Sequence, residues 1–220
     1  MGGTATDNDC EYIYLEAFYN AEFEIAFRIK RLQKAKNVKK VSNIEKELKL
    51  VEEHTDILLS EKQKEAIKAI NDNNVTIITG GPGTGKTTII KSIIEIYKQK
   101  KYKIVLCAST GRAAKRMTET TGEEASTLHR LLEIGRVDEE SLFKKDKEYQ
   151  GAPIDGDIII VDEVSMVDMF IMSYLLDCIY LGTKLILVGD SDQLPSVGPG
   201  SVLHDLIASE KIPTVHLDKI

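Results

Sequence analysis

The sequence is poor in cysteine, lacks tryptophan and contains no long apolar run. Its three cysteines, Cys10, Cys107 and Cys178, are far apart and odd in number, which excludes a disulfide framework and the usual metal-site spacings. We therefore expect a reducing, cytoplasmic compartment. Because a membrane-spanning helix needs about 18 or more apolar residues in succession, we expect no membrane partner either.

The N-terminal stretch MGGTATDND lacks both the basic and the apolar region of a secretory signal. We expect residues 1–10 to be a disordered leader or a cloning remnant. The sequence also lacks internal repeats and low-complexity tracts, which argues against solenoids and repeat arrays. A net charge of -6 does not by itself indicate a nucleic-acid partner.

Two helical patterns come before any recognisable motif. Apolar residues recur at helical spacing from Ile13 to Leu32 and again from Ile44 to Val51. A capping box formed by residues 42 and 45 is predicted to begin the second helix. We expect residues 11–54 to be a small helical appendage at the N-terminal side of the main domain.

Short apolar runs alternate with helical patterns over residues 55–220. The runs are rich in Val and Ile and continuous, as in parallel strands buried on both faces. Strand and helix in repeated alternation predict an α/β three-layer fold with a parallel central sheet. The expected strands are 75–79, 103–109, 157–162 and 184–189, with a further one at 214–217. The polar stretch 137–157 is expected to be a long surface excursion.

Residues 80–87 read GGPGTGKT and match G-x-x-x-x-G-K-[ST] at every fixed position. The motif follows a predicted strand and precedes a predicted helix, as a phosphate-binding loop does. Its glycines let backbone N–H groups turn toward phosphate oxygens, and the helix N-terminus adds partial positive charge. Lys86 is expected on the β- and γ-phosphates of ATP and Thr87 on Mg²⁺. The predicted nucleotide contacts are Gly81, Gly83, Thr84, Gly85, Lys86, Thr87 and Thr88.

Two carboxylates, Asp162 and Glu163, follow the apolar run at 158–161. Ligands of open α/β sheets bind at the carboxyl ends of the strands. We expect Asp162 to hold Mg²⁺ through water and Glu163 to accept a proton from an attacking water. Such a pair, after a complete phosphate loop, indicates nucleotide hydrolysis rather than simple nucleotide binding.

Gln63 has two interpretations. With Ser60 it forms the capping-box pattern of a helix N-terminus, in which the Gln63 side chain accepts from the Ser60 N–H. The same amide offers a donor and an acceptor to the edge of an adenine base. The residues alone leave both roles open, with the cap favoured.

Six stretches together resemble superfamily 1 DNA helicases, most closely the RecD-like branch that includes the exodeoxyribonuclease V alpha subunit. The resemblance implies a RecA-like motor domain of an ATP-dependent helicase that moves 5′ to 3′ on DNA and acts in recombination and repair. It also raises Gln63 to an adenine contact. The stretches are LSEKQ at 59–63, the GGPGTGKT loop, ASTGRAAKRM at 108–117, STLHRLL at 126–132, VDEVSMVD at 161–168 and LVGDSDQLPSVGPG at 187–200.

The resemblance places Gln193 near the γ-phosphate, on a strand between the phosphate-loop strand and the Asp162 strand. Lys86, Glu163 and Gln193 then become the expected catalytic residues. Single-stranded DNA is the partner that the resemblance implies. Several of the candidate contacts also have a purely structural alternative, such as helix capping for Ser109 and Thr110. The candidate contacts are Ser109, Thr110, Gly111, Arg112, Thr127 and His129.

Helicases of this class complete their ATP site with arginines from a second RecA-like domain. No such second domain is recognisable in the 220 residues, so we expect a piece of a longer protein. These residues alone are expected to bind ATP–Mg²⁺, hydrolyse it slowly and not unwind DNA. Besides the second domain, other recombination subunits are expected partners.

Two other functions fit parts of the sequence. The motor domain of a DNA-transfer relaxase–helicase is one, although the His and Tyr chemistry of a relaxase is missing upstream. A nucleotide-switched module that binds DNA or protein through residues 11–54 is the other. A mere switch needs neither Glu163 nor Gln193, and this favours the motor.

Overall fold

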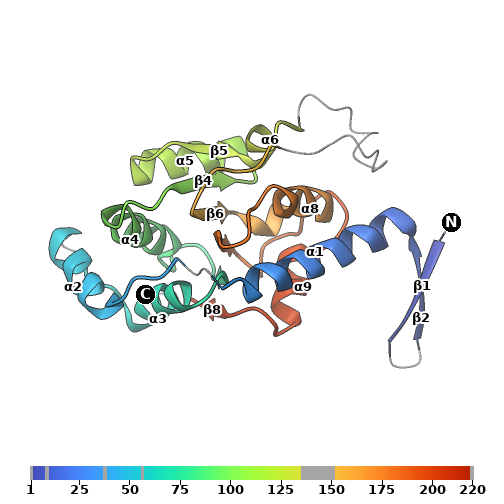
Figure 1. The fold of residues 1–220 in the computed structure, drawn as a ribbon, viewed down its shortest axis with the longest axis horizontal. Coiled ribbons are helices and arrows are strands. Elements are labelled where there is room, and N and C mark those ends of the chain that lie inside the picture. Colours follow the sequence, from blue (N-terminus) through green and yellow to red (C-terminus); the bar gives the residue numbers. More distant parts are fainter. Residues whose placement is uncertain (1, 8–9, 37–38, 56, 135–151, 219–220) are drawn as a thin grey trace.

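The computed structural model describes residues 2–7, 10–36, 39–55, 57–134 and 152–218. A six-stranded sheet with strand order β5-β4-β6-β7-β3-β8 lies at its centre (Figure 1). All neighbouring strands of this sheet pair in parallel, as the sequence predicts. The strands are β3 (Val75–Thr79), β4 (Ile104–Ala108), β5 (Ala125–Thr127), β6 (Ile158–Asp162), β7 (Lys184–Gly189) and β8 (Thr214–His216).

The continuous apolar strands are explained by burial on both faces. Along β6, Ile158 and Ile160 join one hydrophobic cluster, whereas Ile159 and Val161 join the other. Successive side chains of a strand point to opposite faces, so each strand needs apolar residues at every position. This is the three-layer arrangement that the sequence predicts.

Helices cover the two faces separately (Figure 1). One face carries α2 (Ile44–Thr55), α3 (Glu61–Asp72), α4 (Lys86–Gln99) and α5 (Gly111–Thr121). The other carries α1 (Glu16–Lys34), α6 (Leu128–Leu131), α8 (Met169–Asp177) and α9 (Val202–Ala208). A 3₁₀ turn, η2 (Val164–Met166), follows β6.

The N-terminal region differs from its expected form. Instead of a disordered leader, β1 (Gly2–Asp7) and β2 (Cys10–Leu15) form an antiparallel hairpin. The first helix accordingly begins at Glu16, and its residues Ala21, Ile25 and Ile29 belong to the same core as the sheet. The helix α1 packs against α8 and therefore belongs to one of the two helical layers that cover the sheet. It is not a separate appendage with its own core.

Some local expectations are wrong and others cannot be compared. The backbone N–H of Lys46 bonds to Asn43 Oδ1 at 3.2 Å, so Asn43 rather than Ser42 caps α2. The short strand β5 was not foreseen, because three residues are too few to show a pattern. Most of the expected excursion at 137–157 lies outside the described residues; only 152–157 are described.

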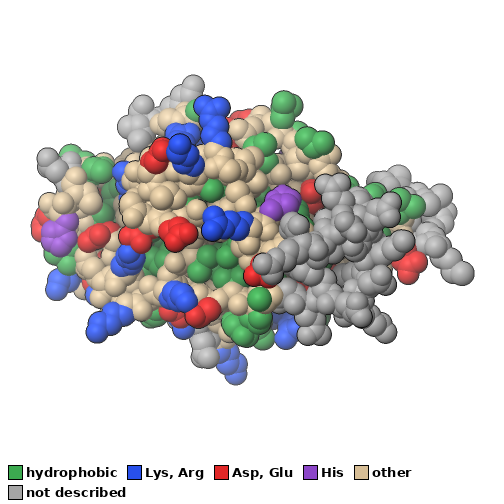
Figure 2. All heavy atoms as spheres, turned by 90° about the horizontal axis from the view of Figure 1, so that it is seen from above, with side chains coloured by type: hydrophobic (Ala, Val, Ile, Leu, Met, Phe, Trp, Pro, Cys, Tyr) green, Lys and Arg blue, Asp and Glu red, His purple; other side chains and the backbone are tan. Residues whose placement is uncertain are grey.

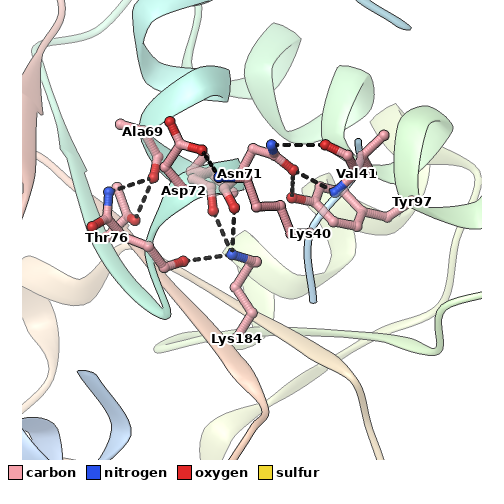
Figure 3. A network of polar contacts seen from close by, with 10 residues as sticks. Lys40, Val41, Ala69, Asn71, Asp72, Thr76, Tyr97 and Lys184 are labelled. Carbon is pink, nitrogen blue, oxygen red and sulfur yellow. Dashed lines mark hydrogen bonds and ion pairs between the residues drawn. The ribbon is translucent and has the colours of Figure 1, made fainter. Parts of the chain in front are cut away.

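A polar cluster joins the end of α3 to the segment before α2 (Figure 3). The Asn71 side chain accepts from the Val41 N–H at 2.8 Å and donates to the Val41 carbonyl at 3.1 Å. The Tyr97 hydroxyl also donates to Asn71 Oδ1, at 3.1 Å. The buried Asn71 amide thus satisfies both the N–H and the carbonyl of Val41, which belongs to no helix or strand.

Lys184 lies in the same cluster and is completely buried (Figure 3). Its ammonium donates to the carbonyl oxygens of Ile70, Asn71 and Asn73, which end α3. Burial lowers the pKa of Lys184 to about 7, although nearby Asp72 acts in the opposite direction. The lysine therefore caps the C-terminus of α3 from the first residue of β7.

Candidate functional site

The phosphate loop connects β3 to α4, as the motif predicts. Gly83 and Gly85 have φ values of +80° and +87°, a left-handed conformation that glycine adopts without strain. The buried Thr84 hydroxyl donates to the Gly81 carbonyl at 2.9 Å and closes the loop. The backbone is thereby folded in the way that phosphate binding by N–H groups requires.

Lys86 begins α4, and its ammonium donates to the carbonyls of Gly80 and Gly81, the latter at 3.0 Å. Thr87 and Thr88 follow in the first turn and are partly exposed. N–H groups of a first helical turn have no partner within the helix and carry partial positive charge. The loop and helix start therefore present groups that favour an anion.

Asp162 and Glu163 lie at the carboxyl end of β6. Burial raises the pKa of the Asp162 carboxyl, while a 2.9 Å hydrogen bond from the Glu163 N–H lowers it. Glu163 adds to the rise through its charge, and Lys86 opposes it. Because β3, β7 and β6 are neighbouring parallel strands, the phosphate loop after β3 and the carboxylates at the end of β6 share one edge of the sheet.

Glu163 has a left-handed backbone with φ of +54°, although it is not a glycine. Such a conformation is uncommon for a bulky residue and concentrates at functional sites. Here it turns the chain sharply between β6 and η2.

Gln193 lies in the loop after β7, and its Oε1 accepts a hydrogen bond from the Ser165 hydroxyl at 2.7 Å. β7 lies between β3 and β6, which confirms the expected strand position. The Ser191 N–H bonds to Thr79 Oγ1 at 3.1 Å and holds this loop at the end of β3. Gln193 thus belongs to the same sheet edge as the phosphate loop and the two carboxylates.

Ser165 is the site residue that the sequence reasoning did not identify. It follows Glu163 by two residues, and its hydroxyl links η2 to the Gln193 loop. The signal in the sequence was the D-E-x-S order, but a serine in that place has many structural uses. Only its contact reveals the link.

The end of the Gln193 loop packs on the start of α8. The Met169 N–H bonds to the Pro199 carbonyl at 3.0 Å, and a Cβ on Gly198 would overlap the Asp168 carboxylate. Ser201 stands at the N-cap of α9, and its side chain makes no capping hydrogen bond within the described part of the chain.

Gln63 is buried and forms both bonds of the predicted capping box. Its Oε1 accepts from the Ser60 N–H at 2.9 Å, and its own N–H bonds to Ser60 Oγ at 3.3 Å. The capping role is confirmed. The cap uses Oε1 and not the amide nitrogen, so the adenine contact stays a compatible prediction.

The candidate DNA contacts gather at the neighbouring ends of β4 and β5. Ala108 pairs with Thr127, which places Ser109 and Thr110 beside the start of α6. Thr110 Oγ1 caps α5 and Thr127 Oγ1 caps α6, each accepting a backbone N–H at 3.2 Å. Ser109 Oγ is buried without a hydrogen-bond partner among the described residues. The remaining candidates, Gly111, Arg112 and His129, are exposed.

The surface over α5, β5 and α6 carries charges of both signs (Figure 2). Lys115, for example, lies 3.8 Å from Glu119 on α5. This mixture provides no continuous basic face for nucleic acid. Any DNA contact here depends on individual hydroxyl and N–H groups and on single cationic side chains such as Arg112, rather than on a large positive field.

No cluster of three or more His, Cys, Asp or Glu side chains suited to a metal occurs in the described parts of the chain. Thr87 and Asp162 instead offer one hydroxyl and one carboxylate on the same sheet edge. Mg²⁺ in nucleotide sites typically takes one or two such protein oxygens, with phosphates and waters completing its shell. The residues present therefore fit the expected ion.

A family model described as an AAA domain matches residues 63–199, more than half of the chain. The chain belongs to this AAA family. The matched range contains the phosphate loop, both carboxylates and Gln193, and it places this AAA domain among nucleoside-triphosphatase folds.

Curated relatives of this AAA domain include RecD proteins. It is 39% identical over 162 residues to the ATP-dependent RecD2 DNA helicase of Deinococcus radiodurans. This match covers 74% of this chain and 21% of that protein. It is 38% identical over 170 residues to the RecBCD enzyme subunit RecD of Mycolicibacterium smegmatis, covering 67% and 30%. The predicted membership in the RecD-like superfamily 1 helicases is confirmed, and the chain spans less than a third of either relative.

Solved helicase structures share the fold of this AAA domain. The Pif1 helicase from Candida albicans matches with a TM-score of 0.52 and 28% identity, over 74% of this chain and 40% of that one. A structure of two coordinating Pif1 helicases at forked double-stranded DNA matches with a TM-score of 0.50 and 22% identity, over 75% and 45%, and supports the fold alone. The RecA-like three-layer fold is confirmed. No helix within the described ranges is long and apolar enough to cross a membrane.

Proposed function

We propose that this domain binds ATP with Mg²⁺ and drives an ATP-dependent DNA helicase that moves 5′ to 3′ in DNA recombination or repair. The observation that carries this proposal is the gathering of the phosphate loop, Asp162, Glu163 and Gln193 at one edge of the sheet. A phosphate loop alone binds a nucleotide. A carboxylate and an amide added to it are the groups that hydrolysis needs.

ATP binding is assigned to the loop and the start of α4. Backbone N–H groups of Gly81 and of residues 83–88 surround the phosphates, and the Lys86 ammonium exchanges its two carbonyl partners for phosphate oxygens. Gln63 contacts adenine through its amide nitrogen while Oε1 keeps the cap. The buried position of Gln63 limits its motion and favours a fixed contact.

Catalytic roles follow from the carboxylates and Gln193. Mg²⁺, held by Thr87 and through water by Asp162, would neutralise phosphate charge. Glu163 accepts a proton from the attacking water; it follows the half-buried Asp162 at the carboxyl end of β6. Gln193 donates through its amide nitrogen while Ser165 holds Oε1. A fixed amide of this kind can position water without searching its rotamers.

Single-stranded DNA is the proposed polymer substrate. Ser109 offers a hydroxyl for which the described residues provide no hydrogen-bond partner. The start of α5 adds the N–H groups of Gly111 and Arg112, which have no partner within the helix. Such groups bind phosphate oxygens without reading base sequence. Thr127 and His129 extend the contact from the adjacent β5–α6 junction.

The second RecA-like domain and other recombination subunits are proposed as protein partners. The names of the relatives support this, one as a DNA helicase and one as a subunit of the RecBCD enzyme. The second domain would supply arginines to the bound triphosphate, as in related motors. Because of this, the 220 residues alone are expected to bind ATP but to turn it over slowly.

The test of this function is DNA-stimulated ATP hydrolysis by the full-length protein. Glu163→Gln should keep ATP binding and reduce the turnover rate by about 100-fold or more, the usual contribution of a general base. Glu53→Gln, at an exposed position on α2, is the matched control and should hydrolyse like wild type. Unchanged DNA-stimulated turnover in Glu163→Gln would show that the base is assigned wrongly.

A further inference from the structure

A groove with a cavity volume of about 660 Å³ lies between α1 and the α9 region. The two helices lie close together in the lower right of Figure 1. The floor of the groove is apolar and consists of buried or partly buried side chains. They include Ile25, Ile29, Met169, Val202, Leu206 and Ile212. None of the proposed nucleotide or DNA contacts lines it, so the proposed function leaves the groove unused.

Exposed aromatic side chains continue the apolar surface along the outer side of α1. Phe23 and Phe27 are 57% and 46% exposed, and their rings stack with centroids 6.1 Å apart. The Arg31 guanidinium lies 5.6 Å from the centre of the Phe27 ring. Ala26, which lines the groove, lies between the two phenylalanines in the sequence and within one turn of both. Large exposed aromatics beside an apolar groove indicate an interaction surface.

The two ends of the groove carry opposite charges. At one end Glu22 and Asp205 are close enough for Asp205 to raise the Glu22 pKa, after the larger effect of burial. At the other end lie Lys30 and Lys34, with Lys211 held nearby because Gln33 donates to its carbonyl at 2.8 Å. The charges are thus separated along the groove and not mixed.

The length of the groove decides what class of partner fits. From Glu22 to Lys34, α1 extends by about 18 Å at 1.5 Å per residue. This is about the length of a three-turn helix, whose side chains at i, i+4 and i+7 would fill an apolar floor. A helix with a basic end and an acidic end would match the two charged ends of the groove.

We propose that this groove binds an amphipathic helix of another polypeptide, with a basic end at Glu22 and Asp205 and an acidic end at Lys30, Lys34 and Lys211. The apolar stripe of that helix lies on the groove floor, and Phe23 and Phe27 cover its outer side. The surface is separate from the nucleotide site, so this docking does not need ATP.

Two synthetic helical peptides of about twelve residues test this proposal. Both have the same apolar stripe and the same composition, but one has basic and acidic ends whereas the other has its charges scrambled. Binding to the full 220-residue chain is measured by fluorescence anisotropy at low salt. The bipolar peptide should bind about tenfold more tightly, since several partly exposed charge pairs together contribute this much.

Variants of the chain locate the binding. Ala26→Arg, at an exposed position in the groove, should abolish binding of both peptides without unfolding the chain, as circular dichroism will check. The combined changes Glu22→Gln, Asp205→Asn, Lys30→Gln and Lys34→Gln should remove the preference for the bipolar peptide. The matched control, Lys49→Gln with Glu53→Gln on α2, should keep it.

Three results would overturn the proposal. The first is that neither peptide binds the wild-type chain, and the second is that Ala26→Arg binds the peptides as wild type does. The third is found by sedimentation: a wild-type dimer that Ala26→Arg converts to a monomer would mean that a second copy of this chain occupies the groove.

Discussion

At the scale of single residues, Lys184 shows how burial changes an ionisable group. Its side chain is fully buried, and the pKa falls to about 7 from an ordinary value of 10.5. Three carbonyl oxygens at the end of α3 accept its hydrogen bonds. The residue therefore fixes α3, whose other end carries Gln63, to the first residue of the central strand β7.

The shift in Lys184 predicts a pH dependence of stability. Between pH 7 and pH 10.5 the unfolded chain holds a proton on this lysine that the folded chain has lost. The contribution of Lys184 to the free energy of unfolding must therefore rise with pH in this window. Denaturant unfolding of wild type and Lys184→Met should show a difference, wild type minus variant, that grows from about pH 6.5 to about pH 9.5.

Lys49→Met is the control for this measurement, because Lys49 is exposed on α2. Its free energy of unfolding should stay parallel to that of wild type over the same pH range. A Lys184 difference that is flat, or that falls with pH, would contradict a depressed pKa at this position.

At the scale of elements, the strands and the phosphate loop were predictable because their signals are local. Residues 75–79 and 184–189 are continuous apolar runs, and the predicted bounds are the observed ones. The loop at 80–87 needs glycines and a Lys-Thr pair in a fixed order, which few structural alternatives share. Burial on both faces leaves a strand little freedom in composition, so the sequence records it clearly.

Other elements depend on contacts that no local pattern records. The bond between Ser165 and Gln193 joins residues 28 positions apart in the sequence. The bond from the Met169 N–H to the Pro199 carbonyl likewise joins residues that are far apart in the sequence. The core role of α1 follows from packing against α8, which lies far along the sequence. An amphipathic helix looks the same in a sequence whether it forms an appendage or a layer of the fold.

The start of α5 offers a stability test at this scale. Thr110 Oγ1 accepts the Ala113 N–H at 3.2 Å and caps the helix. Thr110→Ala should lower the free energy of unfolding by about 1 kcal/mol, and Thr110→Ser should lower it by less than about 0.5 kcal/mol. Urea unfolding measures both. Equal stability of wild type and Thr110→Ala would mean that the cap contributes nothing.

At the scale of the whole molecule, the acidic net charge of -6 and the mixed surface over α5 restrict how DNA can bind (Figure 2). Binding by a few phosphate contacts still releases counterions. The logarithm of the affinity for single-stranded DNA should therefore fall with the logarithm of salt concentration, by about 0.7 per phosphate contacted. Fluorescence anisotropy with labelled oligonucleotides gives this slope.

Arg112→Ala should make the slope shallower by about 0.7, the value of one phosphate contact. Lys49→Ala, an exposed change on α2, should leave the slope as it is. An affinity independent of salt, or an equal slope in wild type and Arg112→Ala, would contradict phosphate binding at the start of α5.

The central claim is that the loop between β3 and α4 binds ATP, and equilibrium titration of the 220-residue chain with ATP and Mg²⁺ tests it most directly. Wild type and Lys91→Ala, an exposed lysine further along α4, should bind with equal affinity. Lys86→Ala should bind at least about tenfold more weakly, because it loses a charge-assisted contact to phosphate. No binding by wild type, or equal binding by Lys86→Ala, would contradict the account.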